Sequence, residues 1–177
     1  ETPQASGPPG ATFDSLTISA MLVVTMVIAL AGATGTIGKA TLKRLIQLGY
    51  EVLELSRQDL GSPEACHKAI SMKASTVKEP VGAVISCIAS RTGEADDAWA
   101  VDYQANANLL TAAQRCGVEQ FVLLSAICVQ KPKLAFQHAK LKFEDELKAS
   151  GLAYSIVRPT AFFKSLSGQL ARVRKGG

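Results

Sequence analysis

Three regularly spaced glycines are the part of the sequence best suited to bind a ligand. They stand at positions 32, 35 and 38, in the run Gly32-Ala33-Thr34-Gly35-Thr36-Ile37-Gly38. Between a strand and a helix, such glycines allow a tight turn, let backbone N–H groups approach a pyrophosphate and let the helix pack closely. The helix N-terminus adds a partial positive charge that attracts the phosphates. The motif predicts a dinucleotide-binding loop formed by Gly32, Thr34, Gly35, Thr36, Ile37 and Gly38.

The residues after the second expected strand indicate which dinucleotide would bind. An NAD enzyme usually carries a carboxylate there, which holds the ribose 2′-hydroxyl group. In this chain the strand ends in Leu55-Ser56-Arg57, without an acid. Because a guanidinium binds a phosphate through charge-assisted, bidentate hydrogen bonds, Arg57 favours NADP(H) over NAD(H). The alternative is that Arg57 is only a surface charge.

The elements that must position these residues alternate along the chain. Short apolar, β-branched runs predict strands, and longer stretches closed by glycine predict helices. Strands are expected over residues 26–31, 51–56, 82–88, 120–125 and 153–158, and helices over 36–48, from 63 onward, over 96–115 and over 136–149. Strands that alternate with helices form a parallel sheet with right-handed crossovers. We therefore expect an α/β fold with a doubly wound parallel sheet of the Rossmann type.

Composition and charge limit the classes of protein that remain. The chain has 177 residues, of which 47% are hydrophobic and 19% charged, and its formal net charge is +4. This length fits one domain with a real core, and the composition excludes wholesale disorder. A small excess of scattered basic residues does not predict nucleic-acid binding. The cysteines show no CxxC spacing, so no metal site is predicted.

The N-terminal part of the chain has two alternative interpretations. Residues 1–14 are rich in proline and glycine, which is typical of a flexible linker. The apolar run Leu16–Ala33 is about as long as the shortest membrane-spanning helix. A buried strand formed by its end alone is favoured, because the glycine motif follows directly. The chain then divides into a linker with a hydrophobic extension (1–25) and an NADP-binding Rossmann domain (26–177), and Leu16–Thr25 is a candidate contact to a membrane or membrane complex.

Several further stretches of the chain resemble a known enzyme family. The runs with this likeness are long and specific: Val84–Gly93, Trp99–Ala105, Phe121–Pro132, Phe136–Glu144 and Tyr154–Leu166. Over about residues 26 to 170 the chain resembles the atypical short-chain dehydrogenases/reductases, and among them the divinyl chlorophyllide 8-vinyl reductases of chlorophyll biosynthesis. The resemblance implies NADPH-dependent reduction of the 8-vinyl group of a tetrapyrrole, divinyl chlorophyllide or protochlorophyllide. It also implies a location in the chloroplast, with association to the thylakoid as a further expectation.

Two catalytic residues follow from the resemblance. Ordinary short-chain dehydrogenases use a Tyr-x-x-x-Lys pair, in which the tyrosine donates a proton and the lysine holds the nicotinamide ribose. Lys140 matches the lysine and would orient the cofactor, but Phe136 stands where the tyrosine would be. A phenyl ring has no proton to donate, which agrees with reduction of a C=C bond rather than of a carbonyl. Ser125, at the end of its strand, would lie beside the nicotinamide.

The resemblance places other residues around the cofactor. Ala89 and Ser90 would line its adenosine side, and Pro159 and Thr160 its nicotinamide side. Asp59 either reaches the adenine or is a turn residue. For the two catalytic candidates, the alternatives are a surface lysine on an exposed helix face and a buried hydroxyl group bonded to the backbone.

Two departures from the family leave other functions open. Only residues 57–61 separate the second strand from the helix cap at Ser62, so the family's separate third strand is expected to be vestigial. The chain ends at Gly177, so we expect a sheet truncated after about six strands, in about half of the enzyme that it resembles. One alternative is a non-catalytic structural subunit docked on a thylakoid photosynthetic complex through Leu16–Thr25. The other is an NADPH-sensing module.

Overall fold

The structure of the chain is a computed structural model that describes residues 26–160. The expected linker and hydrophobic extension over residues 1–25 lie outside the described residues, as does the expected domain boundary. Within residues 26–160, no helix is both long enough and apolar enough to cross a membrane.

Strands and helices alternate in this part of the chain. In chain order they are β1 (Val27–Ala31), α1 (Thr36–Gln47), β2 (Glu51–Leu55), the 3-10 turn η1 (Gln58–Leu60), α2 (Pro63–Val77), β3 (Val81–Ser86), α3 (Ala95–Asp97), the π-helix η2 (Ala98–Gln104), α4 (Ala105–Arg115), β4 (Gln120–Leu124), α5 (Ala135–Ala149) and β5 (Ala153–Val157). The five strands form one parallel sheet in the order β2-β1-β3-β4-β5. The predicted doubly wound α/β fold is confirmed, and five of its roughly six expected strands lie within the described residues.

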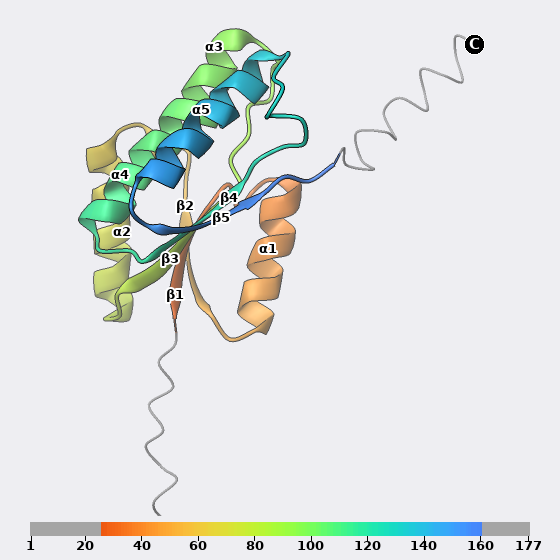
Figure 1. Cartoon of the computed structure of the whole chain (residues 1–177). Helices are drawn as coiled ribbons and strands as arrows, with labels where there is room; N and C mark the ends of the chain where they lie inside the picture. Colours follow the sequence, from red (N-terminus) through yellow and green to blue (C-terminus); the bar gives the residue numbers. More distant parts are fainter. Residues whose placement is uncertain (1–25, 161–177) are drawn as a thin grey trace, which may run out of the picture.

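The helices cover the sheet in two layers. Figure 1 shows α1 on one face and α2, α4 and α5 on the other. Right-handed crossovers produce this arrangement, because the chain moves outward from β1 to β2 and then back across β1 to β3, β4 and β5. Where the direction changes, between β1 and β3, an open α/β sheet leaves a crevice at the carboxyl ends of its strands.

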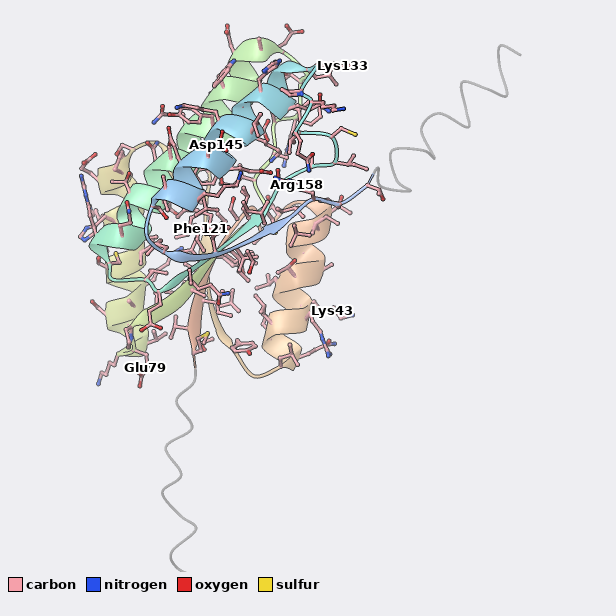
Figure 2. The ribbon with its side chains drawn as sticks, in the orientation of Figure 1. Lys43, Glu79, Phe121, Lys133, Asp145 and Arg158 are labelled. Atoms are coloured by element: carbon pink, nitrogen blue, oxygen red, sulfur yellow. The ribbon has the colours of Figure 1, made fainter. Side chains whose placement is uncertain are left out.

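The larger apolar core lies between the sheet and the layer formed by α2, α4 and α5. β1 is buried along its whole length, as expected for a central strand with helices on both faces. Phe121 of β4 packs against Phe143 of α5 with ring centroids 5.7 Å apart, and both side chains are fully buried. Figure 2 shows Phe121 between the sheet and these helices. A smaller cluster under α1 contains Ile28, Leu45 and Ala83.

The boundaries of the elements follow local signals, with one exception. α2 begins as the sequence predicts, because Ser62 accepts a hydrogen bond of 3.1 Å from the N–H of Ala65 and Pro63 is the first helical residue. Only η1 stands between β2 and α2, so no separate strand forms there.

The helix expected over residues 96–115 is not uniform, because η2 precedes α4. Its wider π turn changes where side chains point, and Asp102 is buried.

The turn between β1 and α1 lies within backbone contact of the end of β3. Gly32 has a φ of +83°, and a Cβ atom there would lie 2.6 Å from the carbonyl oxygen of Cys87. The N–H of Cys87 donates to the carbonyl of Ala31 at 2.9 Å, which fixes this approach. A Cβ atom on Gly38 would overlap the Gly32 carbonyl oxygen. The turn therefore has no room for a side chain at position 32 or 38.

Gly32→Ala is expected to lower the free energy of unfolding more than Gly49→Ala, the matched control. Gly49 has nearly the same φ, +84°, but a Cβ atom there would meet nothing within 4 Å. Both variants incur the left-handed backbone cost, about 1–2 kcal/mol. Only Gly32→Ala adds the overpacking cost of about 1–3 kcal/mol. Chemical denaturation of both variants measures the difference, and equal losses would contradict the backbone contact.

Candidate functional site

A cleft of about 770 Å³ opens at the carboxyl ends of the strands, where the chain changes direction between β1 and β3. Its volume is typical of sites for small molecules and cofactors, about 300–1,000 Å³. The walls come from the glycine loop, the end of β2, the loop after β3, η2 and the start of α4. The lining residues are Gly32–Ile37, Leu55–Arg57, Leu60, Gly61, Cys87–Arg91, Ala100, Val101, Gln104, Ala105, Asn108 and Leu124.

The glycine loop presents the N-terminus of α1 to this cleft. Gly35 is the N-cap residue, no side chain caps the helix there, and its first turn contains no acidic residue. Because the first N–H groups of a helix lack intrahelical acceptors and carry a partial positive charge, this end of α1 suits a phosphate. Gly38 alone among the predicted loop residues does not line the cleft, because it is buried beneath the turn. The other five, Gly32, Thr34, Gly35, Thr36 and Ile37, form part of the wall.

Among the described residues 26–160, two arginines line the cleft and no carboxylate does. Arg57 follows β2, and Arg91 lies in the loop after β3. Asp97 holds this loop, because its Oδ2 atom accepts hydrogen bonds from the backbone N–H groups of Arg91 at 2.8 Å and Thr92 at 3.0 Å. The bonds from the Thr92 and Arg91 backbone lower the pKa of Asp97, and the nearby charge of Arg57 lowers it further. Asp97 thus ties the loop down close to Arg57.

The structure places Asp59 as a turn residue. Its Oδ2 atom accepts hydrogen bonds from the backbone N–H of Ser56 at 2.7 Å and from the Ser56 hydroxyl at 2.9 Å. Lys73 Nζ lies 3.9 Å away, and Asp59 does not line the cleft. The Asp59 carboxylate therefore stabilises the turn after β2 and is not directed at an adenine.

The Lys140 side chain points into the protein, so the alternative of a surface lysine is wrong. Its Nζ atom lies 3.0 Å from Asp102 Oδ1, and it donates to the carbonyl oxygens of Ile88 and Leu124 at 3.3 Å each. Lys140 is 4% exposed and Asp102 is 1% exposed. The other carboxylate oxygen of Asp102 accepts a hydrogen bond of 2.5 Å from the Ser90 hydroxyl. The ammonium group of Lys140 thus lies behind the cleft wall.

Ser125 is a buried hydroxyl bonded to a side chain and not to the backbone. It donates to Glu144 Oε1 at 2.6 Å. Glu144 is fully buried and also accepts two hydrogen bonds from Arg158, one of them from Nε at 3.0 Å. Burial acts to raise the pKa of Glu144, but the hydrogen bonds from Arg158 and Ser125 and the charge of Arg158 outweigh it and lower the pKa. Figure 2 shows Arg158 at the end of β5, close to α5.

The residues predicted on the nicotinamide side, Pro159 and Thr160, do not line the cleft. Pro159 and Thr160 follow β5, and the Pro159 carbonyl accepts a hydrogen bond of 3.0 Å from the N–H of Ile127. Phe136 is half-buried in the first turn of α5, four residues before Lys140. Ala89 and Ser90 do line the cleft. Some of the predicted site residues therefore line the cleft, and others lie outside its lining.

Sequence reasoning missed several residues that build this site. Asp102 anchors Lys140 and Ser90, and the amide of Asn108 donates to the Leu60 carbonyl at 3.0 Å. Asn106 accepts a hydrogen bond of 2.5 Å from the Ser86 hydroxyl, which ties α4 to the end of β3. The available signal was the four-residue spacing of Asp102 and Asn106, which puts two polar side chains on one otherwise apolar helix face.

Comparison with protein families and curated proteins gives consistent matches. The family model described as NAD(P)H-binding matches residues 32–177. The divinyl chlorophyllide a 8-vinyl-reductase of Cucumis sativus is 42% identical over 175 residues, covering 84% of this chain and 42% of the relative. The enzyme of the same name from Arabidopsis thaliana is 43% identical, covering 82% and 41%. The photosystem II assembly factor Ycf39 of Cyanophora paradoxa is 27% identical, covering 82% and 49%.

The chain spans about two fifths of the length of the two reductases and about half that of the assembly factor. Among solved structures, it is similar to the dTDP-4-dehydrorhamnose reductase of Bacillus anthracis in complex with NADP. The TM-score is 0.66 at 18% identity, covering 85% of this chain and 61% of the other. At this identity the likeness shows the fold alone.

Glu144→Gln is expected to lower the free energy of unfolding at neutral pH by about 1–3 kcal/mol, because the amide keeps only one of the two acceptor oxygens that Arg158 and Ser125 use and loses the negative charge that pairs with Arg158. Since the folded pKa of Glu144 lies below its ordinary value of 4.5, its stabilising effect is present above that pH and disappears as the pH falls through the folded pKa. The variant should therefore show a shallower loss of stability on acidification, as measured by urea denaturation from pH 7 to pH 3.

Asp145→Asn is the matched control, because Asp145 lies on the same helix with its side chain 64% exposed. Its effect should stay within about 0.5 kcal/mol. If the two variants had the same acid dependence, the buried carboxylate would not be the source of the effect.

Proposed function

We propose a function on the premise that this chain belongs to the NAD(P)H-binding family, whose model spans residues 32–177. The cleft at the carboxyl ends of the strands binds the nicotinamide cofactor, with the pyrophosphate at the N-terminus of α1. The observation that carries this proposal is the pair of positions, Gly32 and Gly38, where the backbone leaves no space for a side chain. They bring the turn and the helix end close enough for backbone N–H groups to face a phosphate.

The lining of the cleft favours NADPH over NADH. An NAD site places a carboxylate at the end of the second strand, and none of the described residues that line this cleft is acidic. Arg57 stands at that end, is exposed, and forms no ion pair within the described residues. Its guanidinium is therefore available to a 2′-phosphate group. Ala89 and Ser90 flank the adenosine side from the opposite wall.

The reaction that we propose is reduction of the 8-vinyl group of divinyl chlorophyllide or protochlorophyllide, in the chloroplast. Bound NADPH supplies the hydride for such a reduction. The relatives named divinyl chlorophyllide a 8-vinyl-reductase, chloroplastic, support this substrate and this location. Phe136 supports it as well, because a phenyl ring in the position of the proton-donating tyrosine cannot serve carbonyl chemistry. The substrate is a tetrapyrrole that would bind beside the nicotinamide side of the cleft.

Ser125, Pro159 and Thr160 mark this nicotinamide side in the proposal. They lie at the carboxyl ends of β4 and β5, next in the sheet to the strands that form the cleft. Leu124, the residue before Ser125, already lines the cleft. Because the Ser125 hydroxyl donates its proton to Glu144, it can only accept a hydrogen bond from a ligand.

A second candidate function is that of a non-catalytic subunit of a photosynthetic assembly. The similarity to photosystem II assembly factor Ycf39 favours it, and so does the absence of a proton donor at position 136. In this alternative Leu16–Thr25, outside the described residues, contacts the membrane or the complex. An NADPH-sensing module is the third candidate, and it would bind NADPH without turnover.

One assay separates these candidates. The protein in its full-length form is incubated with divinyl chlorophyllide and NADPH, and loss of the 8-vinyl group is followed by chromatography and absorbance. Turnover supports the reductase. Binding of NADPH without turnover favours the sensor, and failure to bind NADPH favours the structural subunit.

Arg57→Ala is expected to weaken NADPH binding by about 10- to 100-fold, because a charge-assisted hydrogen bond contributes about 1.5–3 kcal/mol. NADH, which lacks the 2′-phosphate, should lose less than about threefold in affinity. Lys43→Ala is the control, because Lys43 is exposed on α1 away from the cleft (Figure 2). Calorimetric titration with both cofactors decides the question, and an equal loss for NADH and NADPH would contradict the role of Arg57.

A further inference from the structure

A buried polar cluster lies directly behind the cleft wall. It consists of Lys140 on α5, Asp102 on η2 and Ser90 in the loop after β3. Lys140 Nζ and Asp102 Oδ1 are 3.0 Å apart, and the Ser90 hydroxyl donates to Asp102 Oδ2 at 2.5 Å. The side chains of Lys140 and Asp102 are 5% and 1% exposed, so water does not screen this pair.

The cluster connects three segments that form the cleft. Lys140 donates to the carbonyl of Ile88, just after β3, and to the carbonyl of Leu124, the last residue of β4. Ser90, Ile88 and Leu124 all line the cleft, whereas Lys140 and Asp102 do not. Two of the three N–H groups of the ammonium therefore donate to carbonyl oxygens inside the protein, and its charge is paired with Asp102. The cluster meets the cofactor space only through the residues that it holds.

We propose that Asp102 and Lys140 are positioning residues, which fix the Ile88–Ser90 wall of the cofactor cleft. Lys140 then acts on the cofactor through this wall and not by direct contact of its ammonium group. The inference rests on the proposed function in that NADPH is the ligand of the cleft. It differs from the role implied by the Tyr-x-x-x-Lys motif, in which the lysine itself holds the nicotinamide ribose.

Removing one charge of the Lys140–Asp102 pair should disturb the wall more than removing both charges. A buried charge without its partner is strongly unfavourable, whereas a neutral pair of similar volume is often tolerated. Lys140→Met leaves Asp102 buried and unpaired. Asp102→Asn combined with Lys140→Met removes both charges and keeps an amide oxygen that accepts from the Ser90 hydroxyl. The double variant therefore lacks the ammonium group and its hydrogen bonds to the Ile88 and Leu124 carbonyls, but it contains no unpaired buried charge and retains the link from residue 102 to Ser90.

The test measures NADPH affinity by calorimetry for the parent chain, K140M, D102N/K140M and the control K142M. Lys142 lies on the same helix, but its side chain is 56% exposed and pairs with Glu146. We expect K140M to bind NADPH at least about tenfold more weakly, and the double variant and K142M to stay within about threefold of the parent. If the double variant binds as weakly as K140M, removing the unpaired charge does not restore the wall and the proposal is overturned.

Ser90→Ala keeps the test decisive if K140M does not fold. This variant leaves both charges in place and removes only the link to the wall, so NADPH binding should weaken by about tenfold. The amides of residues 88–91 should also exchange hydrogen faster than in the parent. Unchanged affinity and unchanged exchange would overturn the proposal.

Hydrogen exchange also separates this inference from the proposed function. If the parent chain binds no NADPH, the proposed function fails, but the wall can still be examined. Residues 88–91 should then exchange faster in Ser90→Ala and, where it folds, in K140M, and return to the parental rate in D102N/K140M. Parental exchange rates in the single variants would show that the cluster does not position the wall.

Discussion

The backbone contact between Gly32 and Cys87 is the constraint on which the rest of the site depends. The turn after β1 approaches the end of β3 so closely that no side chain fits between them. This approach directs the N-terminus of α1 into the space between the strands, where Gly35 caps the helix without a side chain. The position of the cleft follows, because the crevice of an open α/β sheet forms where the chain changes direction.

Two ion pairs with buried carboxylates, Lys140 with Asp102 and Arg158 with Glu144, tie the carboxyl ends of β3, β4 and β5 to the helices. The Lys140–Asp102 pair is buried on both sides, and such a pair seldom stabilises a fold more than well-packed apolar residues would, because both charges lose their hydration. Here the two pairs fix the positions of the helices relative to the strand ends, because each charged group must lie next to its partner. Their location beside the cleft connects the packing of α5 with the shape of the cofactor space.

The proposed cofactor site therefore departs, at the position of the acid, from the short-chain dehydrogenases that the sequence resembles. Phe136 removes the proton donor, and Asp102 neutralises the lysine that would assist such a donor. The Ser125 hydroxyl is likewise committed to Glu144. A site that binds a nicotinamide cofactor without a tyrosine acid agrees with reduction of a C=C bond. It agrees equally with a relative that has lost catalysis, which gives the turnover assay its importance.

Local periodicity, capping and backbone freedom were enough to predict the five strands, the Ser62–Pro63 helix start, the glycine loop and the place of Arg57 after the second strand. The partners of Lys140, Ser125 and Asp59, and the π-helix that buries Asp102, became known only from the folded chain. Lys140 and Asp102 lie far apart in the sequence, on two different helices, and no local pattern connects them. Their contact arises because α5 and η2 pack on the same face of the sheet, and the need to neutralise a buried charge then selects the partner.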